Sequence, residues 1–357
     1  MVVRHATGSY AVIVRDGARA DLAALLDERH PGARAAVLAD TNVASTVGSP
    51  LPSAPLLTFP AGEVHKSRTT WADLTDRLLA AHFDRHTVIV AFGGGVTTDL
   101  GGFVAATLLR GVPWIAMPTT TLAMLDAAVG GKTGVDTDAG KNLVGAFHPP
   151  SAVICDPGVL ATLPDRNFRE GLAEAVKHAA TLDDHYGDWI GRNVPVIASR
   201  DPATLETLIR RSVELKADVV TDDERESDRR AALNAGHTLA HAIERATDYA
   251  VPHGEAVAIG LVLETRVAER MGIARAGTAN RIAALLAALG LPIAPPALDR
   301  ERIMTAMQAD KKNRAGVVHA ALIASFGTMA RNGETWTHPL DLRLLTEVIQ
   351  EATTDVS

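Results

Sequence analysis

An apolar run at residues 87–92 leads directly into three consecutive glycines at positions 93–95. β-Branched and apolar residues favour a buried strand, and glycines at its end permit a tight turn into a helix. Such a turn brings backbone N–H groups and the positive end of a helix dipole close to a bound phosphate. A tight turn without a ligand would have the same sequence, and the usual Gly-x-Gly-x-x-Gly spacing is absent. The run therefore predicts a strand–turn–helix unit of an α/β fold, and a nucleotide site there remains one of two interpretations.

Segments of strand and helix character alternate along the first part of the chain. We expect strands at residues 10–14, 35–38, 87–92, 114–117 and 152–155, and helices at 20–29 and 71–82. Helical periodicity then dominates, at residues 167–181, 202–220, 231–246, 256–270 and 279–289. The predicted fold class is α/β, with an N-terminal Rossmann-like parallel-sheet domain over residues 1–155 and a C-terminal all-helical domain over residues 156–357.

Composition narrows the class of protein and of partner. The formal net charge of −7 argues against nucleic acid and anionic membranes as partners. Cys155 is the only cysteine, so no disulfide can form within the chain and a reducing compartment is expected. The first fifteen residues lack the apolar core of a signal peptide, and no segment has the uninterrupted apolar length that spans a bilayer. We predict a cytoplasmic protein without membrane contact.

Five polar residues recur at helical spacing in the second half of the chain. Steps of four, four, three and four residues separate Glu226, Arg230, Asn234, His237 and His241. If these residues belong to one helix, they form one stripe among small and apolar neighbours. A single histidine there would most often be a hydrogen-bonded core residue, and Arg230 could simply pair with Glu226. The whole stripe favours a wall that contacts a metal or a polar ligand.

Two further segments could complete such a site. His253 opens the helix that follows, and Glu174 could add a carboxylate. One glutamate and two histidines form a reasonable zinc set with positions left open for a substrate. Spacing does not decide whether His237 or His241 is the second imidazole ligand. Glu174 and Lys177 could equally form a solvated ion pair along a helix.

A series of motifs resembles the 3-dehydroquinate synthase family of the sugar-phosphate cyclase superfamily. The resemblance covers nearly the whole chain in order, and the combined pattern is highly specific. Its motifs are Gly93-Gly94-Gly95-Val96 with Asp99, Arg110-Gly111-Val112-Pro113, Pro118-Thr119-Thr120, Asp126 with Gly130-Gly131-Lys132-Thr133, Gly140-Lys141-Asn142, Leu172-Ala173-Glu174 with Lys177, Asp223-Glu224-Arg225-Glu226, Leu233-Asn234, Gly236-His237-Thr238, His253-Gly254-Glu255-Ala256 and Asp310-Lys311-Lys312.

The resemblance implies a cofactor set in each predicted domain. Glu174, His237 and His253 match the metal ligands, with zinc as the expected ion and cobalt as the alternative. The NAD contacts that the resemblance implies are Asp40, Asn42, Glu63, Lys66, Gly94, Gly95, Val96, Asp99, Thr119, Thr120, Leu122, Asp126, Lys132, Lys141, Thr162 and Leu163. Residues 1–155 would then be the NAD-binding domain, and residues 156–357 would bind metal and substrate.

The resemblance also implies a catalytic and substrate-binding set. Its members are Lys132, Lys141, Asn142, Lys177, Lys216, Arg230, Asn234, His241, Asp126, Arg110, Glu226 and Lys312. In the family, the arginine that Arg110 matches comes from a neighbouring subunit, which implies a homodimer. Thr97-Thr98, Asp136, Asn167 and Ala240 depart from the commoner residues, but none of these departures removes a matched ligand.

The resemblance implies a lyase of the shikimate pathway to chorismate and the aromatic amino acids. Such an enzyme cyclises a seven-carbon keto-acid sugar phosphate to 3-dehydroquinate and phosphate, and regenerates its NAD. The nearest rival is a secondary-metabolism cyclase that makes an inosose or a valiolone. A metal-dependent alcohol dehydrogenase would not need the phosphate pocket of Arg110, Lys132 and Asn234. A catalytically silent ligand sensor would not need the complete metal and lysine set.

Overall fold

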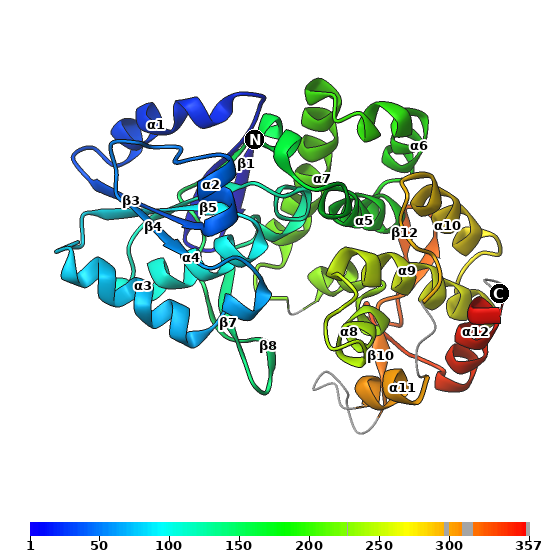
Figure 1. The fold of residues 1–357 in the computed structure, drawn as a ribbon. Helices are drawn as coiled ribbons and strands as arrows, with labels where there is room; N and C mark the ends of the chain where they lie inside the picture. Colours follow the sequence, from blue (N-terminus) through cyan, green and yellow to red (C-terminus); the bar gives the residue numbers. More distant parts are fainter. Residues whose placement is uncertain (227, 296–299, 309–316, 355–357) are drawn as a thin grey trace. The chain divides into compact units, whose positions relative to one another are not determined.

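The chain of the computed structural model divides into two compact units (Figure 1). The structure describes residues 1–226, 228–295, 300–308 and 317–354. Unit 1 comprises Met1–Phe168 and Arg200–Thr221, and unit 2 comprises Arg169–Ser199 and Asp222–Ser357. The predicted boundary after residue 155 lies before the end of the first segment and leaves out the return of the chain to unit 1 in helix α7 (Pro202–Asp222). Local periodicity predicts a helix but does not specify the unit against which it packs.

A seven-stranded sheet forms the centre of unit 1, with strand order β1-β2-β9-β6-β5-β3-β4. Strand β1 pairs antiparallel with β2, and all other neighbouring strands are parallel. The predicted parallel sheet is therefore confirmed. The strands are β1 (Val2–His5), β2 (Gly8–Val14), β3 (Arg34–Asp40), β4 (Leu56–Phe59), β5 (Thr87–Gly93), β6 (Trp114–Pro118) and β9 (Ala152–Cys155).

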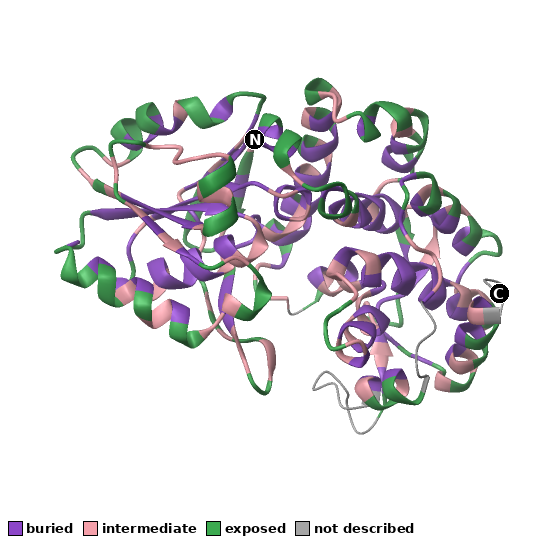
Figure 2. Cartoon of the chain, viewed as in Figure 1, coloured by how far each residue is buried: buried purple, intermediate pink, exposed green. Residues whose placement is uncertain are grey.

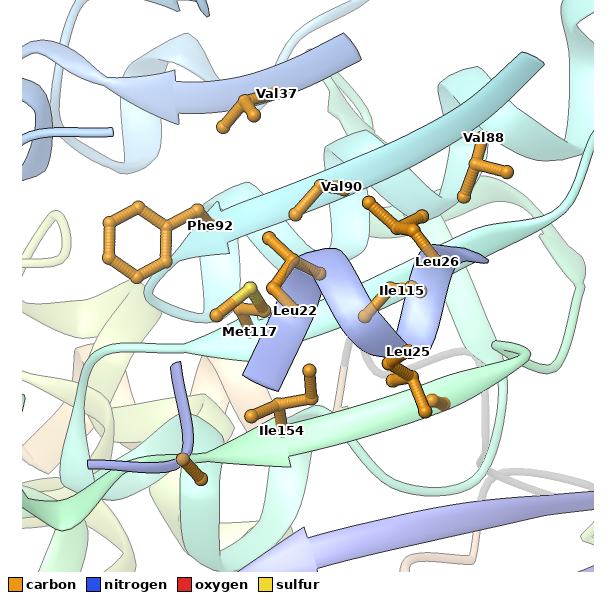
Figure 3. Packing of buried hydrophobic residues seen from close by; sticks show 12 residues of the cluster. Leu22, Leu25, Leu26, Val37, Val88, Val90, Phe92, Ile115, Met117 and Ile154 are labelled. Carbon is orange, nitrogen blue, oxygen red and sulfur yellow. The ribbon is translucent and has the colours of Figure 1, made fainter. Parts of the chain in front are cut away.

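Helices cover both faces of this sheet. The leucines of α1 (Leu22–Arg29) pack on alternate residues of β5, Val88, Val90 and Phe92, together with side chains of β6 and β9 (Figure 3). The β5 residues that alternate with these three point to the opposite face of the sheet. On that face, Ala91 lies close to Gly101 of α4 (Gly95–Thr107). Every residue of β5 is buried as a result. Figure 2 shows this burial, with the outer sides of α1 and α3 (Arg68–Ala80) exposed.

The structure adds a hairpin that the sequence patterns did not predict. Strands β7 (Lys132–Thr137) and β8 (Gly140–Phe147) pair antiparallel in unit 1. Glycines and polar residues interrupt the alternation that marks a strand, and no residue of β8 is fully buried. The remaining short elements of unit 1 are α2 (Thr41–Thr46), η1 (Ala18–Asp21), η2 (Glu63–His65), η3 (Leu108–Arg110), η4 (Ala123–Ala127) and η5 (Pro157–Thr162).

Unit 2 is mainly helical. Its helices are most of α5 (Asp165–Leu182), α6 (Asp184–Ala198), η6 (Arg229–Asn234), α8 (His237–Ala246), α9 (His253–Arg270), α10 (Thr278–Ala288), α11 (Arg300–Gln308) and α12 (Leu342–Thr354). Helix α9 is buried over most of its length. Among the residues that the structure describes, no helix has both the length and the apolar character that crossing a membrane requires.

Two features of unit 2 differ from the sequence predictions. Helix α6 was not predicted, because Gly187, Gly191 and Pro195 interrupt its helical pattern. The unit is also not purely helical, since β10 (His319–Ala320) pairs with β13 (His338–Pro339) and β11 (Ile323–Ser325) pairs with β12 (Thr328–Met329). These strands have two or three residues each, which is too short for a periodic signal.

Candidate functional site

Three neighbouring parallel strands of unit 1 end at the same edge of the sheet. Strand β3 ends at Asp40, β5 at Gly93 and β6 at Pro118, and β5 lies between the other two. The chain passes from β3 outward to β4 and then returns to β5 on the other side of β3, so the strand order reverses here. Parallel α/β sheets bind ligands at the carboxyl ends of their strands next to such reversals.

The glycine turn after β5 has no room for side chains at two positions. A Cβ atom on Gly93 would lie 2.2 Å from Oγ1 of Thr97, and one on Gly94 would lie 2.9 Å from Cγ2 of Thr120. Gly94 is the N-cap of α4 and brings no side-chain cap to the backbone N–H groups of the first helical turn. Backbone donors at a helix N-terminus suit an anion such as a dinucleotide phosphate.

The Thr119 side chain gives a second indication of a polar ligand at this edge. Its hydroxyl is buried and has no hydrogen-bond partner among the residues that the structure describes. Thr119 N donates to Gly93 O at 2.9 Å, so this threonine lies next to the glycine turn. A buried hydroxyl without a partner is unfavourable, and a bound dinucleotide would satisfy it. The residues at this edge therefore fit NAD, and contact with Thr119 and Thr120 remains a prediction.

Asp40 is held in place at the same edge. Its Oδ1 accepts hydrogen bonds from the backbone N–H groups of Asn42 at 2.9 Å and Val43 at 3.0 Å, so it caps α2. Oγ1 of Thr97 donates to Oδ2 of Asp40 at 3.4 Å. Thr97 is one of the departures from the commoner family residues. In this chain it orients a carboxylate that we predict to contact NAD.

A cluster around the buried Lys66 side chain joins five of the predicted NAD and substrate residues. The Lys66 ammonium donates to Asp99 Oδ2 at 2.5 Å and to Asn142 Oδ1 at 2.6 Å. Lys141 Nζ lies 3.5 Å from Glu63 Oε1. Burial by itself lowers the pKa of Lys66, but the nearby carboxylates, led by Asp99 and Glu63, outweigh it and raise that pKa above its ordinary value. Lys66 is therefore a buried cation that ties hairpin β7–β8 to α4.

Asp136 belongs to this cluster, although sequence reasoning did not include it among the site residues. Its Oδ1 accepts from the backbone N–H of Asn142 at 2.8 Å, and its own N–H donates to Lys66 O at 2.7 Å. Asn142 has a φ of 56°, a left-handed conformation that this bond helps to hold. Asparagine is frequent at position 136 in the family and also offers an acceptor oxygen. The departure to aspartate can therefore keep this hydrogen bond.

The other residues that we predicted in unit 1 are more dispersed. Lys216 Nζ contacts Asp126 twice, at 3.0 Å from Oδ1 and 2.6 Å from the backbone oxygen. Lys132 is exposed at the start of β7, and Arg110 is exposed at the end of η3 with a φ of 70°. Among the described residues, no hydrogen bond links Arg110 or Thr162 to the cluster around Lys66. Val96, Leu122 and Leu163 are half-buried near the ends of their elements, and Lys312 lies outside the described residues.

In unit 2, the fold brings together the three residues that we predicted as metal ligands. Glu174 lies on α5, His237 begins α8 and His253 begins α9. Glu174 Oε1 lies 3.7 Å from His237 Nε2 and 3.6 Å from His253 Nε2. Zinc bonds of about 2.0–2.2 Å place tetrahedral ligand atoms roughly 3.3–3.6 Å apart. The two distances from Glu174 are therefore close to the separation that one zinc ion requires, and all three donor atoms lie within 4.8 Å of one another.

The second nitrogen of each imidazole has its own partner. His237 Nδ1 lies 3.2 Å from Ala235 O, and His253 Nδ1 lies 3.4 Å from Glu244 Oε2. Metal-bound histidines in proteins usually have such a carbonyl or carboxylate partner, which fixes the tautomer and turns the other nitrogen to the metal. Sequence reasoning missed Glu244, and no signal in the pattern distinguishes this glutamate from an exposed helical one. The residues present fit a divalent metal.

The two imidazoles of this grouping have opposite electrostatic surroundings. Burial lowers the pKa of His253, but the carboxylates of Glu174 and Glu244 outweigh that effect and raise it to about 10. Burial and the Lys177 ammonium lower the pKa of His237 well below its ordinary value. Lys177 is itself buried and forms an ion pair with Glu174. Two carboxylates thus stabilise positive charge at His253, and a metal could replace the proton there.

The polar stripe that we predicted on one helix is not continuous. Residues 229–234 form the turn η6, Ala235 is extended, and α8 begins only at His237. Gly236, with a φ of 78°, breaks the helix that we expected at 231–246. Glu226 lies before η6 and accepts a hydrogen bond from Asn234 Nδ2 at 2.5 Å. Glu226 and Asn234 are therefore brought together by the turn η6, and not by their spacing along one continuous helix.

The structure also separates the two histidines between which spacing could not choose. His237 shares the metal-ligand grouping with Glu174 and His253. The ring of His241 lies one helical turn further on, with its centroid 5.6 Å from that of His237 and 6.2 Å from that of His253. His241 belongs to a different grouping, with Glu244 and His253. The geometry thus favours His237 as the second imidazole ligand and leaves His241 beside the centre.

We expect Gly254→Ala to disrupt this grouping. A Cβ atom at Gly254 would lie 1.9 Å from the backbone oxygen of Glu170, one turn before Glu174. Helices α5 and α9 would have to separate, and forced overpacking costs roughly 1–3 kcal/mol or more. Chemical unfolding should show that loss, with weaker zinc binding. Gly191→Ala is the control, because its Cβ would lie at an ordinary 3.7 Å from Leu285; equal stability of the two variants would contradict the close-contact argument.

Comparisons with known proteins agree with these features. The family "3-dehydroquinate synthase N-terminal" matches residues 56–170, and "3-dehydroquinate synthase C-terminal" matches residues 171–313. A 3-dehydroquinate synthase of Halorhodospira halophila is 46% identical over 279 residues, which are 78% of this chain and 79% of that protein.

Solved structures show the same fold in related cyclases. A 2-deoxy-scyllo-inosose synthase in complex with carbaglucose-6-phosphate, NAD+ and Co2+ has a TM-score of 0.92 at 28% identity, with 99% of each chain covered. A 2-epi-5-epi-valiolone synthase from Streptomyces hygroscopicus subsp. jinggangensis 5008, with NAD+ and Zn2+ bound, has a TM-score of 0.86 at 28% identity, with both chains fully covered. With both family regions matched in order and a relative at 46% identity, the chain belongs to the 3-dehydroquinate synthase family.

Proposed function

We propose that this chain converts 3-deoxy-D-arabino-heptulosonate 7-phosphate into 3-dehydroquinate and inorganic phosphate. The observation that carries the proposal is the grouping of Glu174, His237 and His253, in which both imidazoles also have an Nδ1 partner. Relatives that are named 3-dehydroquinate synthase reach 46% identity, whereas the solved inosose and valiolone synthases share 28%. The larger identity favours the dehydroquinate reaction over its secondary-metabolism alternatives.

The proposed cofactors are NAD at the sheet edge of unit 1 and one zinc ion in unit 2. When bound, NAD supplies a reversible hydride acceptor and the metal supplies a Lewis acid for a substrate oxygen. The turn at Gly93 and Gly94 orients the dinucleotide through backbone N–H groups. Asp40 is fixed by its own helix cap and by Thr97. These residues would hold the dinucleotide at the sheet edge.

The substrate carries a carboxylate and a phosphate, which require cationic donors. Arg230 is almost fully buried, and its Nη1 donates to Glu224 O at 2.6 Å, which fixes the guanidinium plane. We assign substrate binding to the polar residues Lys132, Lys141, Asn142, Lys177, Lys216, Arg230, Asn234 and His241. Within each unit, their role is to contact and orient polar groups of the substrate, because positioning supplies much of the rate of such a reaction.

The proposal includes a cytoplasmic homodimer. Arg110 is exposed at the end of η3, where its φ is positive. We assign it to the active site of the partner subunit, as the family resemblance implies. A mixed dimer of one Arg110→Ala chain and one His253→Ala chain tests this assignment, because it would retain one intact site only if Arg110 acts across the interface.

The function is tested by offering the purified protein three phosphorylated sugars in parallel. These are the seven-carbon keto-acid phosphate, glucose 6-phosphate and sedoheptulose 7-phosphate. We expect the keto-acid to have a specificity constant higher by at least about 30-fold, since pairing of a desolvated carboxylate with its donors contributes roughly 2–5 kcal/mol. Phosphate release measures the rate, and mass spectrometry with NMR identifies the ring.

Two results of this assay would contradict the proposal in different ways. Faster cyclisation of either carboxylate-free sugar would exclude dehydroquinate formation but retain a cyclase. Consumption of one NAD for each product molecule would instead indicate a simple dehydrogenase. Dehydroquinate formation with NAD unchanged in amount is the expected result, because elimination and ring closure involve no net oxidation.

A further inference from the structure

The start of helix α8 lacks a local cap. The first N–H groups of a helix have no partner within the helix, and a side chain before the first turn usually accepts from them. The residue before α8 is Gly236, which has a left-handed conformation and no side chain. The donors at this helix start must therefore be satisfied from elsewhere in the fold. His237, the proposed metal ligand, is the first residue of the helix.

A glutamate on the neighbouring helix supplies the missing cap. Glu264 of α9 accepts from Gly236 N at 2.9 Å through Oε2 and from Leu239 N at 2.7 Å through Oε1. Its side chain is buried. The two hydrogen bonds bracket His237 in the sequence, so they fix the backbone on both sides of the ligand. A capping interaction normally made within one helix is here made between two.

A close backbone contact lies one turn away on α9. A Cβ atom on Gly260 would lie 2.0 Å from Gly236 O, and one on Gly236 would lie 2.7 Å from Leu261 N. The start of α8 therefore packs directly on the middle of α9. The same helix α9 begins with His253, the other imidazole of the grouping. The position of α8 along α9 thus sets the separation of the two histidines.

We infer that Glu264 is a positioning residue for the metal centre, which holds His237 at the spacing from His253 that one ion requires. The inference rests on the proposed metal site. Glu264 is not itself a proposed ligand, because its carboxylate accepts from backbone N–H groups. Without Glu264, two backbone donors would lose their acceptor in a buried place, and α8 would shift to find others. The imidazole of His237 would move with the helix start.

Glu264→Met tests the inference with a matched control. Methionine keeps the volume of the side chain but cannot accept the two N–H groups. The control is Glu269→Met on the same helix, because Glu269 Oε1 accepts from Ala279 N at 2.9 Å and caps α10 in the same manner, away from the histidines. The zinc dissociation constant of the full-length, metal-stripped protein is measured by competition with a chromophoric chelator. Circular dichroism and thermal unfolding of the metal-free variants report their folding.

We expect Glu264→Met to bind zinc roughly 10–100-fold more weakly than the unaltered chain, as for other residues that orient metal ligands. Glu269→Met should retain the affinity although its thermal stability falls. A folded Glu264→Met with unchanged affinity would overturn the inference, because a purely structural cap would lower stability alone. If Glu264→Met does not fold, Glu264→Gln replaces it. Glutamine keeps one acceptor oxygen but turns its NH2 group towards the other backbone N–H, so zinc binding should still weaken, and unchanged affinity would again overturn the inference.

Zinc binding by the unaltered chain and by His253→Ala distinguishes a failure of this inference from a failure of the proposed function. If both bind zinc equally, the metal centre itself is misassigned, and the role of Glu264 fails with it. If only the unaltered chain binds zinc tightly, the centre is established. The affinity of Glu264→Met then decides the positioning role alone.

Discussion

Replacement of His253 by alanine is expected to remove the metal and the activity together. His253 Nε2 lies 3.6 Å from Glu174 Oε1, and its Nδ1 lies 3.4 Å from Glu244 Oε2. Loss of this ligand leaves one carboxylate and one imidazole, and the zinc affinity should fall by more than the roughly 100-fold upper range seen for residues that only orient ligands. Metal analysis of the purified variant, together with phosphate release from the seven-carbon substrate, measures both effects. Full metal occupancy with normal turnover would exclude His253 as a ligand.

His241→Ala is the matched control for this experiment. Its ring lies close to both proposed ligands, with its centroid 6.2 Å from that of His253, but it does not share their grouping with Glu174. We expect this variant to retain zinc and to lose turnover, because we assign His241 to the substrate. Loss of zinc from His241→Ala with retention in His237→Ala would reverse the assignment of the two histidines.

The fold class was predictable because its signals are local and repeated. Strand β5 has seven consecutive buried residues and ends in a glycine turn, and both features follow from side-chain type alone. The strand order does not follow from such signals. Nothing in the sequence of α7 shows that its contacts return it to unit 1 after two helices, α5 and α6, that lie mostly or entirely in unit 2. The unit against which a helix packs depends on contacts with residues that are distant in the sequence, and a local pattern does not specify these contacts.

The candidate site was predictable to a similar extent. Residue type and family resemblance pointed to Glu174, His237 and His253, and the fold brings all three together. The residues that orient them, Glu244 and Glu264, were missed. Each is a glutamate in an ordinary helical pattern, and only the packing of α8 on α9 turns it toward a backbone donor or an imidazole. The expected continuous helix was wrong for a related reason, since Gly236 breaks it where the two helices meet.

Lys66→Met should destabilise unit 1 even in the absence of NAD. The ammonium is buried between Asp99 and Asn142, at 2.5 and 2.6 Å from their oxygens. Removal of one partner of a buried ion pair costs roughly 3–5 kcal/mol, and the Asp99 side chain is 21% exposed, so partial hydration reduces the loss. We expect the free energy of unfolding to fall by about 3 kcal/mol. This loss corresponds to a fall of roughly 6–12 °C in the unfolding midpoint of a unit of this size. Calorimetry of the NAD-free protein measures it.

The pH dependence and a double variant test whether the ion pair causes this loss. Nearby carboxylates raise the pKa of Lys66, so its stabilising effect is fully present below the unfolded-state value of about 10.4 and disappears only as the pH rises through the higher folded-state value. The charge of Lys66 therefore does not change between pH 6 and 9. Burial raises the pKa of Asp99 and Lys66 opposes that rise, so in the variant the Asp99 carboxyl takes up a proton at a higher pH and the loss of stability should shrink as the pH falls towards 6. Lys66→Met with Asp99→Leu should recover most of the stability, because neither charge is then left buried without the other. Additive losses in the double variant would show that Lys66 and Asp99 stabilise the unit independently.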